Sequence, residues 1–377
     1  MKLLLHFACF AALNSLFMLT SALGMPQPQS GGESLLDEID LTWSATVQPR
    51  ASYGLDEVDD ETSERLGFGL RRARLSLDAE FGDTYGLFYD VDLAGAGLTT
   101  ISLFGYVKPQ DGLLIRFGYL PGAQPQAYIP TPMTRLDLLE RAAIAELWAR
   151  GTIGAAARDF GVDATLTSGK LDASLFVHTG DGSFGPLRGN FSRSVSTLSA
   201  TGGVARTDLA VSSSLRLRDA GLDGLQVGAY ASYNSSANPN TAVQNIGRAY
   251  MSWSGHAYYG AVPGSQALRL KLDVIGVSYE EISSQGNPVV AAQNTLGVSA
   301  LAALRLIDGM ELLARVENYM PDNGGSDVTF VAAGLSFSPS ARRGLPYQRE
   351  RITLAYSSAL PDGRSAHLVE VQGQVSF

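Results

Sequence analysis

The chain has little cysteine, histidine or charge: one Cys and four His in 377 residues, with 17% charged side chains. The one cysteine, Cys9, lies in the first 24 residues, so the remainder offers no disulfide, thiolate nucleophile or Cys-ligated metal. No P-loop or dinucleotide fingerprint is present. The net charge of -9 argues against nucleic-acid binding. We therefore expect no catalysis, no cofactor, no metal and no nucleic-acid partner.

Long apolar runs are also missing. Beyond residue 24 no uninterrupted apolar stretch is long enough for a membrane helix, although 45% of residues are hydrophobic. The apolar residues must therefore be dispersed along the chain. The 41 Gly, 15 Tyr and 15 Phe favour short strands and tight turns over packed helices. Composition thus indicates an all-β protein.

The first segment has the features of an export signal. Lys2 precedes an apolar run from Leu3 to Leu13, and small residues follow up to Gly24. We interpret residues 1–24 as a secretory signal peptide and predict that the mature chain begins at Met25. Residues 25–38 are rich in Pro, Gln, Gly and Ser and are predicted to form a short periplasmic tail. Residues 39–377 are assigned to a single β-barrel domain.

Alternation of polar and apolar residues is the main pattern after residue 38. Leu41, Trp43 and Val47 alternate with Thr42 and Gln48, and the same period continues at 72–81, 85–93, 268–274, 296–305 and 310–317. A membrane-spanning strand needs this period because one face meets lipid and the other meets water. A soluble sandwich can show it too. The lengths of the connections distinguish a membrane barrel from a soluble sandwich.

The connections alternate in length. Strands are predicted to start near residues 39, 65, 84, 98, 112, 150, 170, 206, 223, 247, 266, 292, 309, 327, 347 and 366. Long polar loops are predicted at 54–64, 94–97, 121–149, 180–205, 234–246, 281–291, 320–326 and 359–365, and the turns between them are short. This predicts a transmembrane antiparallel β-barrel of about 16 strands with short periplasmic turns and long external loops. Its last strand alternates up to Phe377, resembling the signal read by the outer-membrane assembly machinery.

Strand parity assigns charged side chains to the lumen. The predicted pore-lining residues are Arg72, Arg74, Asp78, Glu80, Asp90, Asp92, Arg116, Arg216, Arg218, Arg269, Lys271, Arg305, Arg315, Arg349 and Arg351, with Arg50 and Lys108 also facing inward. Several of the cations fall near the periplasmic strand ends. One hypothesis is a mildly anion-attracting inner mouth. The alternative is that these cations pair with neighbouring carboxylates and hold the wall together.

The third long loop contains a different period. Between Arg135 and Trp148 the apolar residues recur at helical spacing, which predicts a short helix folded into the lumen. The candidate constriction residues are Arg135, Asp137, Glu140, Arg141 and Glu146. The alternative is a helix lying on the inner wall with its charges satisfied.

Three other function classes have less support in the sequence. His178, followed by Asp181 and Ser183, is the only group that suggests a hydrolase, and no spacing motif supports it. The acidic segment from Asp56 to Glu64 lacks the ligand positions of a calcium loop. An adhesin or structural barrel with a closed lumen is the main alternative to a channel.

One part of the chain resembles a known family. The basic segment Arg71–Leu77, the turn Phe81–Asp83 and the acidic strand Tyr89–Asp92 resemble the phosphate-selective porin O and P family. The likeness continues through Leu114–Tyr119, Leu139–Arg141 and Arg150–Gly154, covering about residues 65–160. It implies a trimeric sixteen-stranded passive channel whose third external loop folds inward. We therefore expect a bacterial outer-membrane porin that contacts lipid and lipopolysaccharide and passes small hydrophilic solutes or anions.

Overall fold

The computed structural model describes residues 39–58, 61–95, 97–153, 156–180, 210–234, 249–284, 287–322, 326–361 and 364–377. The predicted signal peptide and tail, residues 1–38, lie outside this part. Sixteen strands form the wall: β1 (Ile39–Val58), β2 (Glu61–Phe81), β3 (Tyr85–Asp92), β4 (Thr99–Gln110), β5 (Leu113–Leu120), β6 (Asp159–Ser168), β7 (Leu171–His178), β8 (Ala210–Leu217), β9 (Leu225–Asn234), β10 (Tyr250–Tyr259), β11 (Leu268–Tyr279), β14 (Gln293–Ile307), β15 (Met310–Pro321), β16 (Val328–Phe337), β17 (Glu350–Leu360) and β18 (Arg364–Ser376).

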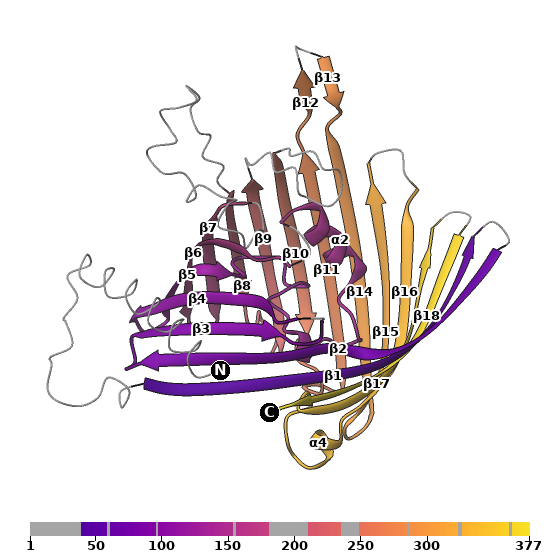
Figure 1. Cartoon of the computed structure of the whole chain (residues 1–377), viewed down its shortest axis with the longest axis horizontal. Helices are drawn as coiled ribbons and strands as arrows, with labels where there is room; N and C mark the ends of the chain where they lie inside the picture. The colour runs from indigo at the N-terminus through magenta and orange to yellow at the C-terminus, as the bar shows by residue number, and fades with distance from the viewer. Residues whose placement is uncertain are drawn as a thin grey trace, which may run out of the picture.

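These strands close into one antiparallel barrel (Figure 1). Each strand pairs with its neighbours in chain order, and β18 pairs with β1 to complete the ring. The closing contact continues to the last residue, where the Phe377 amide donates to the Ala45 carbonyl at 2.9 Å. Closure matters because a backbone group that faces hydrocarbon has no water with which to pair.

The two faces of the wall follow the predicted parity. Leu268, Leu270 and Leu272 point outward and are 45–47% exposed, whereas Arg269 between them is fully buried on the inner side. The same alternation on β15 buries Glu311 and Leu313 on the inner side, with exposed Leu312 between them. The barrel therefore carries an apolar outer surface and a polar inner one, as lipid outside and water inside require.

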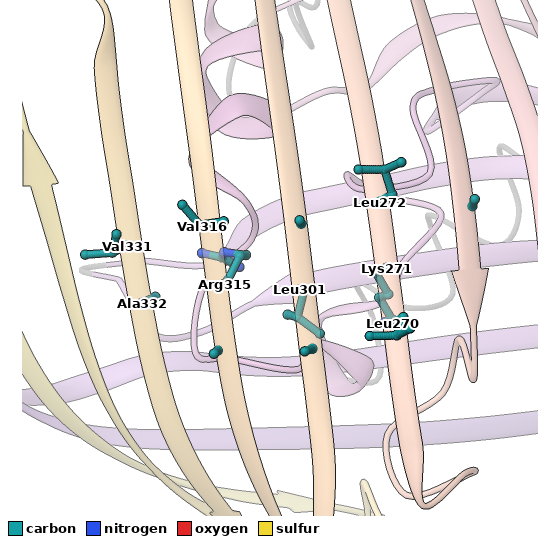
Figure 2. Close-up of a pocket in the computed structure, with 12 residues that line it drawn as sticks. Leu270, Lys271, Leu272, Leu301, Arg315, Val316, Val331 and Ala332 are labelled. Atoms are coloured by element: carbon teal, nitrogen blue, oxygen red, sulfur yellow. The ribbon is translucent and has the colours of Figure 1, made fainter.

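A hollow lies on the outside of this wall. It measures about 570 Å³ and spans β10, β11, β14, β15 and β16. Leu270, Leu272 and Val316 flank it (Figure 2). Ala302 and Ala314, whose side chains add little volume, form part of its floor. Because it opens outward, this hollow is not part of a passage through the barrel.

The predicted strand positions are largely confirmed, with two corrections. The loops expected at 180–205 and 234–246 lie almost wholly outside the described residues. The strand expected near residue 150 begins at Asp159, because helix α2 (Ala143–Gly151) continues the preceding loop. The first connection is not a loop over 54–64: β1 and β2 stay paired up to Val58 and Glu61. The connection between β11 and β14 holds a small hairpin, β12 (Ile282–Ser284) and β13 (Asn287–Val290), which extends beyond the other strands (Figure 1).

The helices in the described residues are short. They are α2, the single turn η1 (Met133–Arg135) and α4 (Pro339–Arg342), the last in the connection between β16 and β17. In the described part of the chain no helix has the length and apolarity needed to cross a membrane.

Candidate functional site

The connection between β5 and β6, residues 121–158, lies inside the barrel and is the candidate site. Its helix α2 places Ile144, Ala145 and Trp148 against the inner side of β9, β10 and β11 in a buried apolar cluster. The indole of Trp148 donates to Ser252 Oγ at 3.2 Å, and the Tyr279 hydroxyl donates to the Gly151 carbonyl at 2.7 Å. The helix is therefore held to the wall by both apolar packing and hydrogen bonds.

The helix is shorter than the spacing from Arg135 to Trp148 predicts. It begins only at Ala143. Leu138 and Leu139 precede it in irregular backbone and pack against Leu301 and Leu313 of β14 and β15. These leucines are apolar because they pack against the wall, and a segment can do so without being helical. Their spacing therefore resembles that of a helix although the backbone is irregular.

Asp137 anchors this segment to β11. Its carboxylate accepts from Lys271 Nζ at 2.6 Å and from Arg269, while Arg269 also donates to Glu311 Oε2 at 2.8 Å. All four side chains of this cluster, those of Asp137, Arg269, Lys271 and Glu311, are nearly inaccessible to solvent. Burial acts to raise the pKa of Asp137, but the charges of Lys271 and Arg269 outweigh it and hold that pKa below its usual value. Arg269 and Lys271 thus face inward as predicted, yet the loop covers them.

Glu140 anchors the loop on the other side, to β1 and β2. Its carboxylate accepts from Arg50 Nη1 at 2.7 Å, Arg71 Nε at 2.7 Å and Arg72 Nη2 at 3.2 Å. Burial acts to raise the pKa of Glu140, but the Arg71 hydrogen bond and the charges of the three arginines outweigh it and lower that pKa to about 2. Glu140 is therefore a carboxylate at physiological pH, in contact with three cations.

Arg71 reaches Glu140 because the strand is irregular there. The register between β1 and β2 shifts at Gln48 and Pro49, which pair with Arg72 and Leu70 and leave Arg71 as the extra residue. A bulge of this kind lets two consecutive side chains face the same way. Parity alone assigns only Arg72 to the lumen, so Arg71 was missed. The bulge has no marker in the sequence apart from Pro49, which lacks the ladder donor.

The remaining constriction candidates lie in different surroundings. Arg141 is buried, donates to the carbonyls of Tyr128 and Thr131 at 3.0 and 3.2 Å, and lies 4.9 Å from the Tyr128 ring centroid. It braces the loop and does not face an opening. Arg135 is exposed. Glu146 is half-buried and forms no ion pair with any described residue. Burial raises its pKa above the usual value.

Basic side chains predominate on the wall next to Glu140. Arg74 lies 3.5 Å from Asp92 and 3.9 Å from Asp90, and its Nε has no hydrogen-bond partner. Arg158, at the end of the loop, donates to Ser102 Oγ at 2.9 Å and to a backbone carbonyl. Together with the arginines around Glu140, these two guanidinium groups place several cations at this level of the lumen. The nearby carboxylates neutralise them only in part.

Elsewhere the inward charges are mostly paired. Lys108 contacts Glu80 at 2.6 Å, Arg116 contacts Asp163 at 2.7 Å and Arg216 contacts Asp172 at 2.8 Å. Arg218 shares Asp172, the Tyr106 hydroxyl donates to Asp78, and Arg351 and Arg315 donate to backbone carbonyls of the loop. Arg305 bonds to the Gly264 carbonyl, and Arg349 lies exposed in the β16–β17 connection, one residue before β17. Most of the cations near the short turns are therefore paired with carboxylates and do not form an open ring of charge.

His178 has partners other than those its neighbours in sequence suggest. Its Nδ1 contacts Asp159 Oδ2 at 2.7 Å and its Nε2 lies 3.5 Å from Ser212 Oγ. Asp181 and Ser183 lie outside the described residues. His178 and its two partners, Asp159 and Ser212, are all buried. The adjoining cavity has space of about 10 Å³, enough for about one water molecule and too small for a substrate. In the described part of the chain no group of three or more His, Cys, Asp or Glu is placed to hold a metal ion.

Comparison with known proteins shows the fold. No family model matches the chain, and no curated protein matches it. Solved structures do match. An anion-selective porin from Comamonas acidovorans has a TM-score of 0.63 at 12% identity, covering 90% of this chain and 100% of that one. The outer-membrane channel DcaP of Acinetobacter baumannii has a TM-score of 0.61 at 13% identity, covering 92% and 99%. Salmonella typhi OmpF has a TM-score of 0.58 at 11% identity, covering 90% and 98%. The chain therefore has the closed sixteen-stranded fold of outer-membrane porins.

Proposed function

We propose that this protein is a porin of the bacterial outer membrane, a passive channel for small hydrophilic solutes with a mild preference for anions. The observation that carries the proposal is a closed barrel with an apolar outside, a charged inside and a loop anchored within the lumen. Such a loop narrows a passage, and a narrow passage gives nearby charges their effect on ions. The similar fold of solved porins and channels supports the same function.

The anion preference is placed at the level of the loop. Arg50, Arg71 and Arg72 surround the Glu140 carboxylate, and Arg50 also contacts Glu370 at 3.0 Å. Arg74, beside Asp90 and Asp92, and Arg158 lie beyond them, so five arginines face four carboxylates at this level. Partly neutralised cations in a constricted lumen raise the local concentration of anions. The family resemblance to phosphate-selective porins suggests phosphate as one such anion.

A homotrimer is part of this proposal. The family resemblance implies a trimer, and one solved structure of similar fold, OmpT of Vibrio cholerae, is described as a trimer form, with a TM-score of 0.52 at 12% identity. Contacts with lipid, with lipopolysaccharide and with the assembly machinery through the strand ending at Phe377 follow from the same location.

The test is conductance of the purified protein in a planar bilayer. We expect discrete channels, and in a potassium chloride gradient a reversal potential that reports chloride preference. Phosphate added to the chloride bath should reduce the chloride current if the two anions share the basic level. Cation preference would refute the anion assignment. An absence of any conductance would instead favour a closed barrel acting as an adhesin or structural protein, and hydrolysis of ester probes would favour an enzyme.

A further inference from the structure

Two phenylalanine rings meet on the inner face of the wall, where β3 and β4 lie side by side (Figure 1). Phe88 of β3 lies opposite Phe104 of β4, and the two rings stack with their centroids 5.0 Å apart and an interplanar angle of 25°. Phe104 shares its face of β4 with Ser102, whose hydroxyl accepts from Arg158 of the lumenal loop at 2.9 Å. Both rings therefore face the lumen, because side chains two positions apart on a strand lie on the same face.

The two rings stay partly exposed. On β9, β10, β11, β14 and β15, by contrast, the lumenal loop covers the inward apolar side chains with α2 and the segment before it. Phe104 is held on one side by Leu120, Ala123 and Phe176, whereas Phe88 belongs to no such cluster of the described residues. A partly exposed ring keeps apolar surface in water that contact with another ring would cover. The pair therefore offers a surface on which an aromatic solute can stack.

A cation adjoins the stacked pair. The guanidinium carbon of Arg116, on β5, lies 5.7 Å from the ring centroid of Phe104. The Arg116 side chain is 20% exposed, whereas the carboxylate that it contacts, Asp163, is fully covered and also accepts from Ser174. Gly118 lies opposite Phe104 on β5 with a φ of +133°, and a Cβ there would come within 2.8 Å of the Phe104 Cα, so β5 places no side chain at that point. The two rings and the exposed guanidinium therefore form a row across β3, β4 and β5.

We propose that this row, formed by Phe88, Phe104 and Arg116, is a lumenal binding site for organic anions that carry an aromatic ring, such as aryl carboxylates. The inference rests on the porin function proposed above and names a class of solute that the channel retains during passage. The ring of the solute stacks on the phenylalanines, and its carboxylate faces Arg116. An approaching anion meets the cation of the Arg116–Asp163 pair, because only that member is exposed. An inorganic anion has no ring to stack, and an uncharged ring gains nothing from the guanidinium pairing.

Block of the chloride current by added carboxylates tests the site. Benzoate and acetate carry the same charge, and cyclohexanecarboxylate has about the size of benzoate without an aromatic ring. In a planar bilayer with potassium chloride, benzoate should half-block the current at a concentration about two- to tenfold lower than cyclohexanecarboxylate does, and acetate should block least. In Phe88→Leu the advantage of benzoate should disappear. Phe117→Leu is the matched control and should keep it, because Phe117 lies on the outer face of β5, beside Gly105.

A double variant tests the cation. Arg116→Gln combined with Asp163→Asn removes the positive charge without leaving a buried carboxylate unpaired. It should weaken the block by benzoate, whereas the block by benzyl alcohol, which has the ring and no charge, should stay the same. Equal block by benzoate and cyclohexanecarboxylate in the unaltered protein would overturn the proposal, and so would a benzoate block that Phe88→Leu leaves unchanged. If Phe88→Leu fails to fold, seen as loss of heat-modifiable migration, Phe88→Ile serves instead.

Saturation-transfer NMR on the detergent-solubilised full chain is a readout that does not need conductance. The ring protons of benzoate should receive saturation from the unaltered protein and from Phe117→Leu, and clearly less from Phe88→Leu. Binding of benzoate by a protein that conducts no ions would contradict the porin function and leave the site standing. Chloride conductance with no preference for benzoate would refute the site and leave the porin function intact.

Discussion

Removing the charge of Asp137 should release the loop from the wall. In Asp137→Asn, Lys271 loses the one carboxylate that it contacts, while Arg269 keeps Glu311. Breaking a buried ion pair by neutralising one partner costs about 3–5 kcal/mol, because the other charge stays buried and uncompensated. Since Arg269 remains paired, we take the lower limit of about 3 kcal/mol. At 1.36 kcal/mol per factor of ten, the population with a detached loop rises on the order of 100-fold.

The assay is single-channel conductance, which should rise or fluctuate as the loop leaves the lumen. Asp163→Asn is the matched control, because Asp163 is equally buried and paired with Arg116 but belongs to the wall strand β6. It should lower thermal stability without enlarging the channel. Adding Lys271→Met to Asp137→Asn removes the uncompensated charge and should restore part of the original conductance. An intact barrel whose conductance is unchanged by Asp137→Asn would show that this anchor does not hold the loop.

Four further predictions concern charge and packing. In Glu140→Gln, the loss of one negative charge at a separation of about 7 Å in water lowers the energy of a passing anion and raises that of a passing cation by about 0.6 kcal/mol each, so the anion-to-cation permeability ratio should rise about sevenfold, measured by reversal potential. Because the pKa of Glu140 is lowered to about 2, its contribution to loop stability is fully present above the usual 4.5 and is lost as pH falls toward 2, which conductance recorded from pH 6 to pH 2 should show. The raised pKa of Glu146 means that acidification neutralises this side chain at a higher pH than an ordinary glutamate, so selectivity should shift toward anions as it titrates and Glu146→Gln should reduce the shift. On the outer wall, Ala302→Leu should fill part of the 570 Å³ hollow without changing conductance, and a changed conductance would contradict the assignment of that hollow to the outside.

The strands were predictable because their signal is local. A strand with one face in lipid and the other in water must alternate, so the parity of Leu268–Val274 or Met310–Val316 is present in the sequence before any folding. Turn residues such as Gly82, Gly169 and Gly309, each with positive φ in the structure, mark where the chain reverses. The closed barrel and the unusual loop after β5 follow from these local signals.

The partners inside the barrel were decided by the tertiary structure. Asp137 contacts Arg269 and Lys271, which lie more than 130 positions later in the chain. Glu140 contacts Arg50, which lies on the first strand, β1. His178 contacts Asp159, which lies 19 positions earlier on another strand. Alternation fixes which face a side chain takes, but not which distant side chain shares the lumen with it. That second relation depends on closure of the ring, on the path of the loop within it, and on the bulge that turns Arg71 inward.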